Sequence, residues 1–169
     1  FQPCLSGGID LYIQIIRDIL QNIVRTASHN DAGSLGCEIP DDIFEKMQGK
    51  SYKADCTLPR ENLRYIHVLH VGFDNQVHEG ELVVNKDIAD DVLEIFKELY
   101  ESGYQIEKVR LVDEYDADDE ASMSDNNSSA FNFRFISHTT KISKHGMGMA
   151  VDINTLYNPY VKTVDGELS

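Results

Sequence analysis

The chain has 169 residues, 29 of them acidic and 15 basic, so its formal net charge is −14 with histidine neutral. This length is typical of one domain, and a hydrophobic content of 41% with few prolines and glycines indicates a globular protein with a core. Nucleic-acid binding depends largely on Lys and Arg displacing counterions, so the acidic excess argues against a nucleic-acid partner.

Residues 1–36 are predicted to form a separate N-terminal segment. Apolar side chains recur at three- and four-residue steps over residues 9–24, which predicts an amphipathic helix. Residues 26–36 are rich in Ser, Asn, Asp and Gly, as is typical of a linker. Charged residues interrupt the apolar stretch, so we expect no transmembrane segment of the roughly 20 residues that a bilayer requires, and no signal peptide is visible. The domain proper is expected over residues 37–169.

Between residues 40 and 112, runs of β-branched and aromatic residues surround one long helical stripe. A turn at residues 72–75 separates two such runs, which predicts a hairpin. We expect Asn85 to cap the helix that follows and Gly103 to end it. This order predicts an α+β domain. The expected elements are a short helix over 43–47, strands over 63–73 and 77–84, a helix over 88–100 and a strand over 106–112.

The next segment, residues 113–125, contains seven acidic residues and no Lys or Arg. We interpret it as a solvated loop. It lacks the order of ligands around a central glycine that an EF-hand calcium loop requires, so a calcium site is not favoured.

A histidine and an aspartate stand close together near the C-terminal end. His145 and Asp152 are seven residues apart, and Gly146, Gly148 and Ala150 between them allow a tight bend. A strand in the second half of this stretch would place apolar side chains on one face and Asp152 on the other. Imidazole nitrogens and carboxylate oxygens are zinc ligands. From the residues alone, a metal site and a structural polar pair both remain open.

The full pattern, Ser143-x-His145-x-x-Gly148-x-Ala150-x-Asp152, is more specific. It resembles the SxHxxGxAxD signature of the zinc D-alanyl-D-alanine carboxypeptidase family, which includes the vancomycin-resistance D,D-dipeptidases and phage L-alanyl-D-glutamate endolysins. Every fixed position of the signature is present. The resemblance extends to residues 125–134, which are similar to the arginine-bearing segment of the family, and to residues 152–160. Weaker similarity reaches back to about Ile39 and does not cover residues 1–36.

The resemblance implies a role for each matching residue. His145 and Asp152 would be zinc ligands, Arg134 would hold the substrate or its developing oxyanion, and Ser143 would be a secondary polar contact near the metal. Arginine suits that role because its planar guanidinium is permanently charged. The family fold is of the hedgehog/D,D-peptidase type, a small antiparallel sheet flanked by helices, in agreement with the α+β prediction.

The resemblance also implies an activity. The expected protein is a bacterial zinc metallopeptidase that hydrolyses cell-wall peptide bonds involving D-amino acids, using metal-activated water. Its partner would be a peptidoglycan stem peptide or another peptide containing a D-amino acid, and the family suggests a cell-envelope or extracellular location. Removal of a terminal D-alanine, cleavage of a dipeptide and cleavage of an L-Ala–D-Glu bond remain open.

The motif supplies two zinc ligands, whereas a catalytic zinc normally has three protein ligands. Members of the family carry the third, a histidine, in a C-terminal segment with a glutamate general base just before it. After Asp152 this chain has no histidine, and its only acidic residues are Asp165 and Glu167. We therefore expect a chain truncated at both ends, whose domain lacks its last catalytic element. The alternative is a non-catalytic module that binds metal or peptide through an incomplete site.

Overall fold

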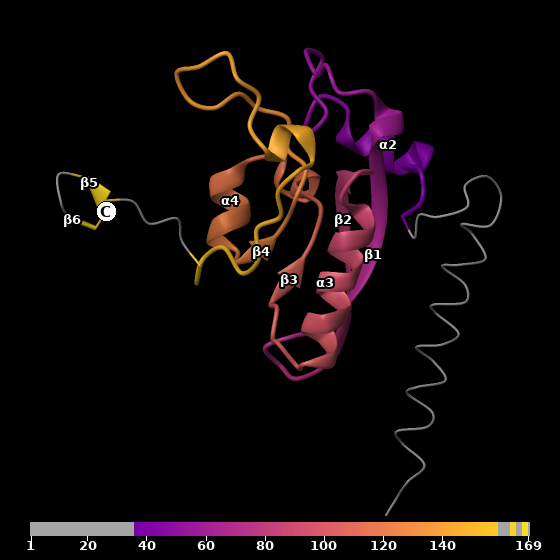
Figure 1. Cartoon of the computed structure of the whole chain (residues 1–169), viewed down its shortest axis with the longest axis vertical. Coiled ribbons are helices and arrows are strands. Elements are labelled where there is room, and N and C mark those ends of the chain that lie inside the picture. Colours follow the sequence, from indigo (N-terminus) through magenta and orange to yellow (C-terminus); the bar gives the residue numbers. More distant parts are fainter. Residues whose placement is uncertain (1–35, 159–162, 165–166, 169) are drawn as a thin grey trace, which may run out of the picture.

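The computed structural model describes residues 36–158, 163–164 and 167–168 (Figure 1). Except for Gly36, the predicted N-terminal helix and linker lie outside the described residues. Within the part of the chain that is described, no helix is long and apolar enough to cross a membrane.

The fold is a mixed α and β structure with a small two-stranded antiparallel sheet and few helices, as the α+β expectation has it at this coarse level. In chain order the elements are α2 (Asp41–Met47), η1 (Arg60–Asn62), β1 (Leu63–Val71), β2 (Val77–Asn85), α3 (Ala89–Glu101), β3 (Lys108–Val109), η2 (Val112–Tyr115), α4 (Asp119–Ser124), β4 (Asn127–Ser128), η3 (His145–Met147), β5 (Thr163–Val164) and β6 (Glu167–Leu168).

The β1–β2 hairpin is confirmed, and it is buried on both faces. Its register runs from Leu63 opposite Asn85 to Val71 opposite Val77. Because side chains alternate between the faces of a strand, the two faces join different apolar clusters. One face packs under α3, which lies along the hairpin in Figure 1, and the other packs against α2 and the segment that follows β4. The first cluster includes Ile66, Val68, Leu82, Val84, Val92 and Phe96, and the second includes Ile43, Met47, Leu63, Tyr65, Val83, Phe131 and Phe133.

Helix α3 ends as predicted and begins differently. Gly103 takes a left-handed φ of 71° just after the helix. The expectation that Asn85 caps the helix is wrong, because α3 begins at Ala89 and Ile88 occupies the cap position. The Asn85 side chain has other partners: its Oδ1 accepts from Asp87 N at 3.1 Å, and its Nδ2 donates to Met147 O at 3.0 Å. A turn therefore separates β2 from α3.

The predicted strand over 106–112 is shortened to β3, which pairs in parallel with β4 over two residues. The acidic segment after it is not simply a solvated loop, because it forms η2 and α4. Asp118 caps α4 by accepting hydrogen bonds from the first turn of the helix. Asp113 is only 6% exposed and accepts from Ser51 N at 3.0 Å and from Ser51 Oγ at 2.9 Å. The segment is thus partly built into the core.

This burial predicts a pH-dependent contribution to stability. Burial raises the pKa of Asp113 above its ordinary value, although both Ser51 hydrogen bonds oppose the shift. The folded state therefore keeps this proton at a pH where the unfolded chain has lost it. The contribution to stability is fully present below the unfolded pKa, about 3.9, and is lost as the pH rises through the raised value.

Asp113→Asn removes this titration, so the free energy of unfolding of the variant should improve relative to wild type as the pH rises from about 3.5 to neutral. Urea unfolding across that range measures the difference. Glu45→Gln, which removes an exposed carboxylate from α2, controls for the loss of one negative charge. A difference that stays constant with pH would contradict the assignment.

Candidate active site

The site is assembled on an extended segment, residues 127–134, that follows α4. Its first two residues form β4 beside β3. Ser129 and Asp152 then exchange both backbone hydrogen bonds, with Ser129 N to Asp152 O at 3.1 Å and Asp152 N to Ser129 O at 2.9 Å. Apart from this bridge, residues 149–153 form no strand. Asp152 still points away from its apolar neighbours Val151 and Ile153, which pack on the first cluster.

The far end of the segment holds the rest of the motif. Asn132 N donates to His145 O at 3.2 Å, and Ser143 N donates to Arg134 O at 2.9 Å. The segment therefore contains Arg134 and is hydrogen-bonded through its backbone to Ser143, His145 and Asp152. All four sequence-predicted residues lie on it or beside it.

His145 and Asp152, called here the His–Asp pair, are in direct contact. His145 Nε2 lies 3.2 Å from Asp152 Oδ2. The other ring nitrogen, Nδ1, lies 2.8 Å from the carbonyl oxygen of Ala130. A carbonyl only accepts, so Nδ1 carries the hydrogen. A proton or a metal ion shared between Nε2 and the carboxylate oxygen would make this contact favourable.

A metal ion fits this arrangement. Two ligand atoms at about 2.0–2.2 Å from a tetrahedral zinc lie about 3.3–3.6 Å apart, slightly more than the 3.2 Å that separates the pair. A hydrogen bond from Nδ1 to a backbone carbonyl is a common way to orient a metal-binding histidine. The side chains are reachable from solvent, being 17% exposed in His145 and 50% in Asp152. Within the described ranges, no group of three or more His, Cys, Asp or Glu side chains could hold a metal, so no other described histidine joins the pair.

The small residues of the motif are required by its backbone. Gly148 has a φ of 66°, and a Cβ there would lie 2.7 Å from Asn85 N. A Cβ on Gly146 would lie 2.7 Å from Ile142 Cγ2. Ser143 Oγ accepts from Gly146 N at 2.9 Å and so stabilises the turn that carries His145. The predicted contact of Ser143 with substrate stays a prediction beside this observed role.

Arg134 is oriented by a residue that the sequence interpretation missed. Its Nε lies 3.0 Å from Oδ2 of Asp119, the first residue of α4. Asp119 Oδ1 in turn accepts from Asn132 Nδ2 at 2.8 Å. The interpretation of the acidic segment as a solvated loop gives no reason to single out Asp119. One signal was available: Asn132 and Arg134 are two residues apart in an extended stretch and therefore share a side.

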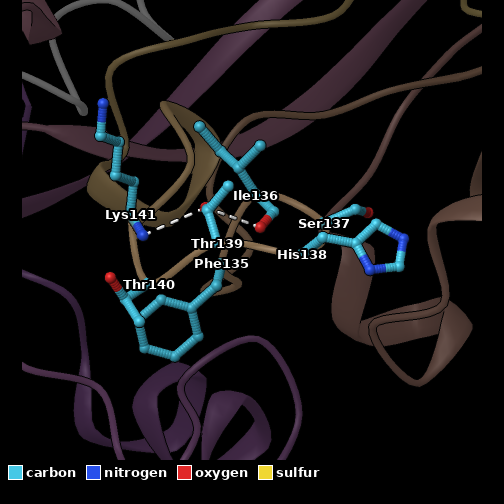
Figure 2. A pocket seen from close by; sticks show the side chains of 7 residues that line it. All are labelled: Phe135, Ile136, Ser137, His138, Thr139, Thr140 and Lys141. Carbon is cyan, nitrogen blue, oxygen red and sulfur yellow. Dashed lines mark hydrogen bonds between the residues drawn. The ribbon is translucent and has the colours of Figure 1, made fainter.

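The loop between Arg134 and Ser143 encloses a shallow hollow of its own. Figure 2 shows its lining, residues 135–141, around Thr139. The Thr139 hydroxyl donates to Ile136 O at 2.8 Å and accepts from Lys141 N at 3.2 Å. Phe135 and Ile136 are 44% and 49% exposed. The lining includes neither member of the His–Asp pair, so this hollow is not the candidate site. The loop is only its neighbour in the sequence.

Comparisons of the chain with protein-family models, with curated proteins and with solved structures found no match. The assignment of function therefore depends on the motif and on the geometry described above.

The motif geometry predicts unequal effects of two glycine substitutions. Gly148 and Gly103 both have positive φ, but only Gly148 is crowded, because nothing lies within 4 Å of a Cβ on Gly103. Gly103→Ala should cost about 1–2 kcal/mol of the free energy of unfolding from backbone strain alone. Gly148→Ala should cost more, because the Asn85 backbone must also move. Urea unfolding of both variants makes the comparison, and equal losses would contradict it.

Proposed function

We propose that the protein is a zinc metallopeptidase of the D-alanyl-D-alanine carboxypeptidase type, which hydrolyses cell-wall peptide bonds involving D-amino acids. One observation supports this most directly: His145 donates through Nδ1 to a backbone carbonyl and presents Nε2 to Asp152 at 3.2 Å. These two residues are the ligand positions of the SxHxxGxAxD pattern. The proposal includes a hedgehog/D,D-peptidase fold, with which a buried antiparallel hairpin covered by α3 is compatible.

In this proposal His145 and Asp152 hold the zinc ion. A bound zinc ion would supply a Lewis acid for the scissile carbonyl and water acidic enough to attack at neutral pH. The proposal needs a third protein ligand and a general base in addition to the pair. The residues described here contribute orientation: the Ala130 carbonyl fixes the imidazole, and the Ser129 bridge fixes the Asp152 backbone.

Arg134 is the proposed substrate-holding residue. Its side chain is 33% exposed, so the guanidinium is open to a ligand and partly shielded from water. A planar cation of this kind binds a carboxylate or a developing oxyanion through paired hydrogen bonds. Ser143, on the neighbouring backbone segment, is the proposed secondary polar contact for the substrate.

The proposal predicts metal binding by the pair. The full chain should bind about one zinc ion, and His145→Ala and Asp152→Ala should each lose it, because a remaining single ligand is too weak a site. Dialysis against zinc followed by elemental analysis measures the stoichiometry. His138→Ala, which removes an exposed imidazole from the neighbouring loop, is the matched control and should keep the metal. Unchanged stoichiometry in both ligand variants would refute the assignment.

A second prediction concerns turnover. A chain that includes the third ligand and the general base required by the proposal should, when loaded with zinc, hydrolyse at least one of three probes: D-alanyl-D-alanine, a stem pentapeptide ending in it, or a peptide with an L-Ala–D-Glu bond. Arg134→Ala should keep its zinc and lose about 10²–10³-fold in kcat, the usual cost of removing a transition-state stabiliser. Retained activity would contradict the role of Arg134. Zinc binding without hydrolysis of any probe would favour the non-catalytic binding module instead.

A further inference from the structure

Arg134 is held by a carboxylate from a distant part of the chain. Asp119 Oδ2 lies 3.0 Å from Arg134 Nε, and the two side chains are 38% and 33% exposed. Partial burial of both groups reduces screening by solvent and salt, so this pair constrains the arginine more than a fully exposed pair would.

A buried amide fixes the carboxylate in turn. Asn132 is 3% exposed, and its Nδ2 donates to Asp119 Oδ1 at 2.8 Å and to Ala117 O at 3.1 Å. Both partners are acceptors, so the amide can have only this orientation. Its Oδ1 is consequently buried with no hydrogen-bond partner among the described residues. The amide is oriented to satisfy Asp119 and Ala117 while its own acceptor goes unsatisfied, which costs free energy.

The contact with Asp119 leaves the donors of the guanidinium available to a ligand. The two groups form an ion pair, and within residues 36–158 no hydrogen bond from a guanidinium nitrogen of Arg134 is found. The planar guanidinium can therefore bind both oxygens of a carboxylate at once. A side chain fixed in advance also loses less rotamer freedom when a ligand binds.

We propose that Asp119, held by Asn132, is a positioning residue that presents the guanidinium of Arg134 to a carboxylate of the substrate. The inference rests on the proposed function, in which Arg134 holds the substrate. Asp119 itself touches neither substrate nor metal in this arrangement.

The first test detects the contact between Arg134 and Asp119 by NMR and does not depend on catalysis. In ¹H–¹⁵N spectra of the full chain, the Arg134 Nε–H signal, identified by its absence in Arg134→Lys, should be separated from the signals of the other arginines, because the carboxylate holds this side chain in one environment. Asp119→Ala should shift the signal to the position typical of an exposed arginine. Asp119→Asn, which removes the charge and keeps an acceptor for Asn132, should shift it likewise and keep α4 intact. Glu120→Ala removes an exposed carboxylate from the same turn and should leave the signal unchanged.

The second test uses D-alanine, a carboxylate that the proposed reaction releases and does not consume, titrated calorimetrically into the zinc-loaded full chain. Asp119→Ala should weaken binding about tenfold and Glu120→Ala should not. In an Arg134→Ala background, Asp119→Ala should have no further effect, because Asp119 acts through the arginine. Asn132→Ala should reproduce part of the loss.

An Arg134 signal that Asp119→Ala leaves unchanged would overturn the proposal, as would an equal loss of affinity from Asp119→Ala with and without Arg134. These outcomes differ from those that would refute the proposed function. If that function is wrong, the His145→Ala and Asp152→Ala variants keep their zinc and Arg134→Ala keeps its turnover.

Discussion

The peptide groups of residues 127–134 are largely buried, so each of their N–H and C=O groups needs a partner inside the protein. The partners come from widely separated parts of the chain: Phe131 N donates to Val83 O at 3.1 Å, and Phe133 N donates to Ser51 O at 2.9 Å. Other groups of the segment bond to β3 and to the motif. Satisfying this one stretch of backbone fixes the hairpin, β3 and the motif relative to one another.

The apolar core and the candidate site are therefore held in place by the same backbone hydrogen bonds. The end of β2 is tied to the motif turn, since Asn85 N donates to Gly148 O at 2.9 Å and its side chain donates to Met147 O. Val151 and Ile153 pack into the first cluster, which leaves Asp152 between them on the opposite side. The half-exposed carboxylate thus has a backbone anchored on both flanks by partly buried side chains.

Sequence patterns predicted the parts of the molecule that depend on local order. The hairpin and α3 follow from period-two and period-3.6 patterns, and Gly103 ends the helix for a local steric reason. The pairing of His145 with Asp152 also followed, because small residues between them permit the bend. What the sequence did not reveal depends on distant contacts: the buried Asp113 carboxylate accepts from Ser51, and β3 pairs with β4 over only two residues. The role of Asp119 also depends on a distant contact, since only the tertiary structure places α4 beside Arg134.

Charge distribution around the site follows from those distant contacts. Residues 126–151 contain no Asp or Glu, although the chain as a whole carries a net charge of −14, and they include Arg134, Lys141 and Lys144. The carboxylates that balance the site come from outside this stretch, Asp152 at His145 and Asp119 at Arg134. An acidic composition by itself indicates solubility and names no function. Here, the fold places two of those acidic residues, Asp152 and Asp119, in contact with His145 and Arg134, so part of the acidic excess lies within the candidate site.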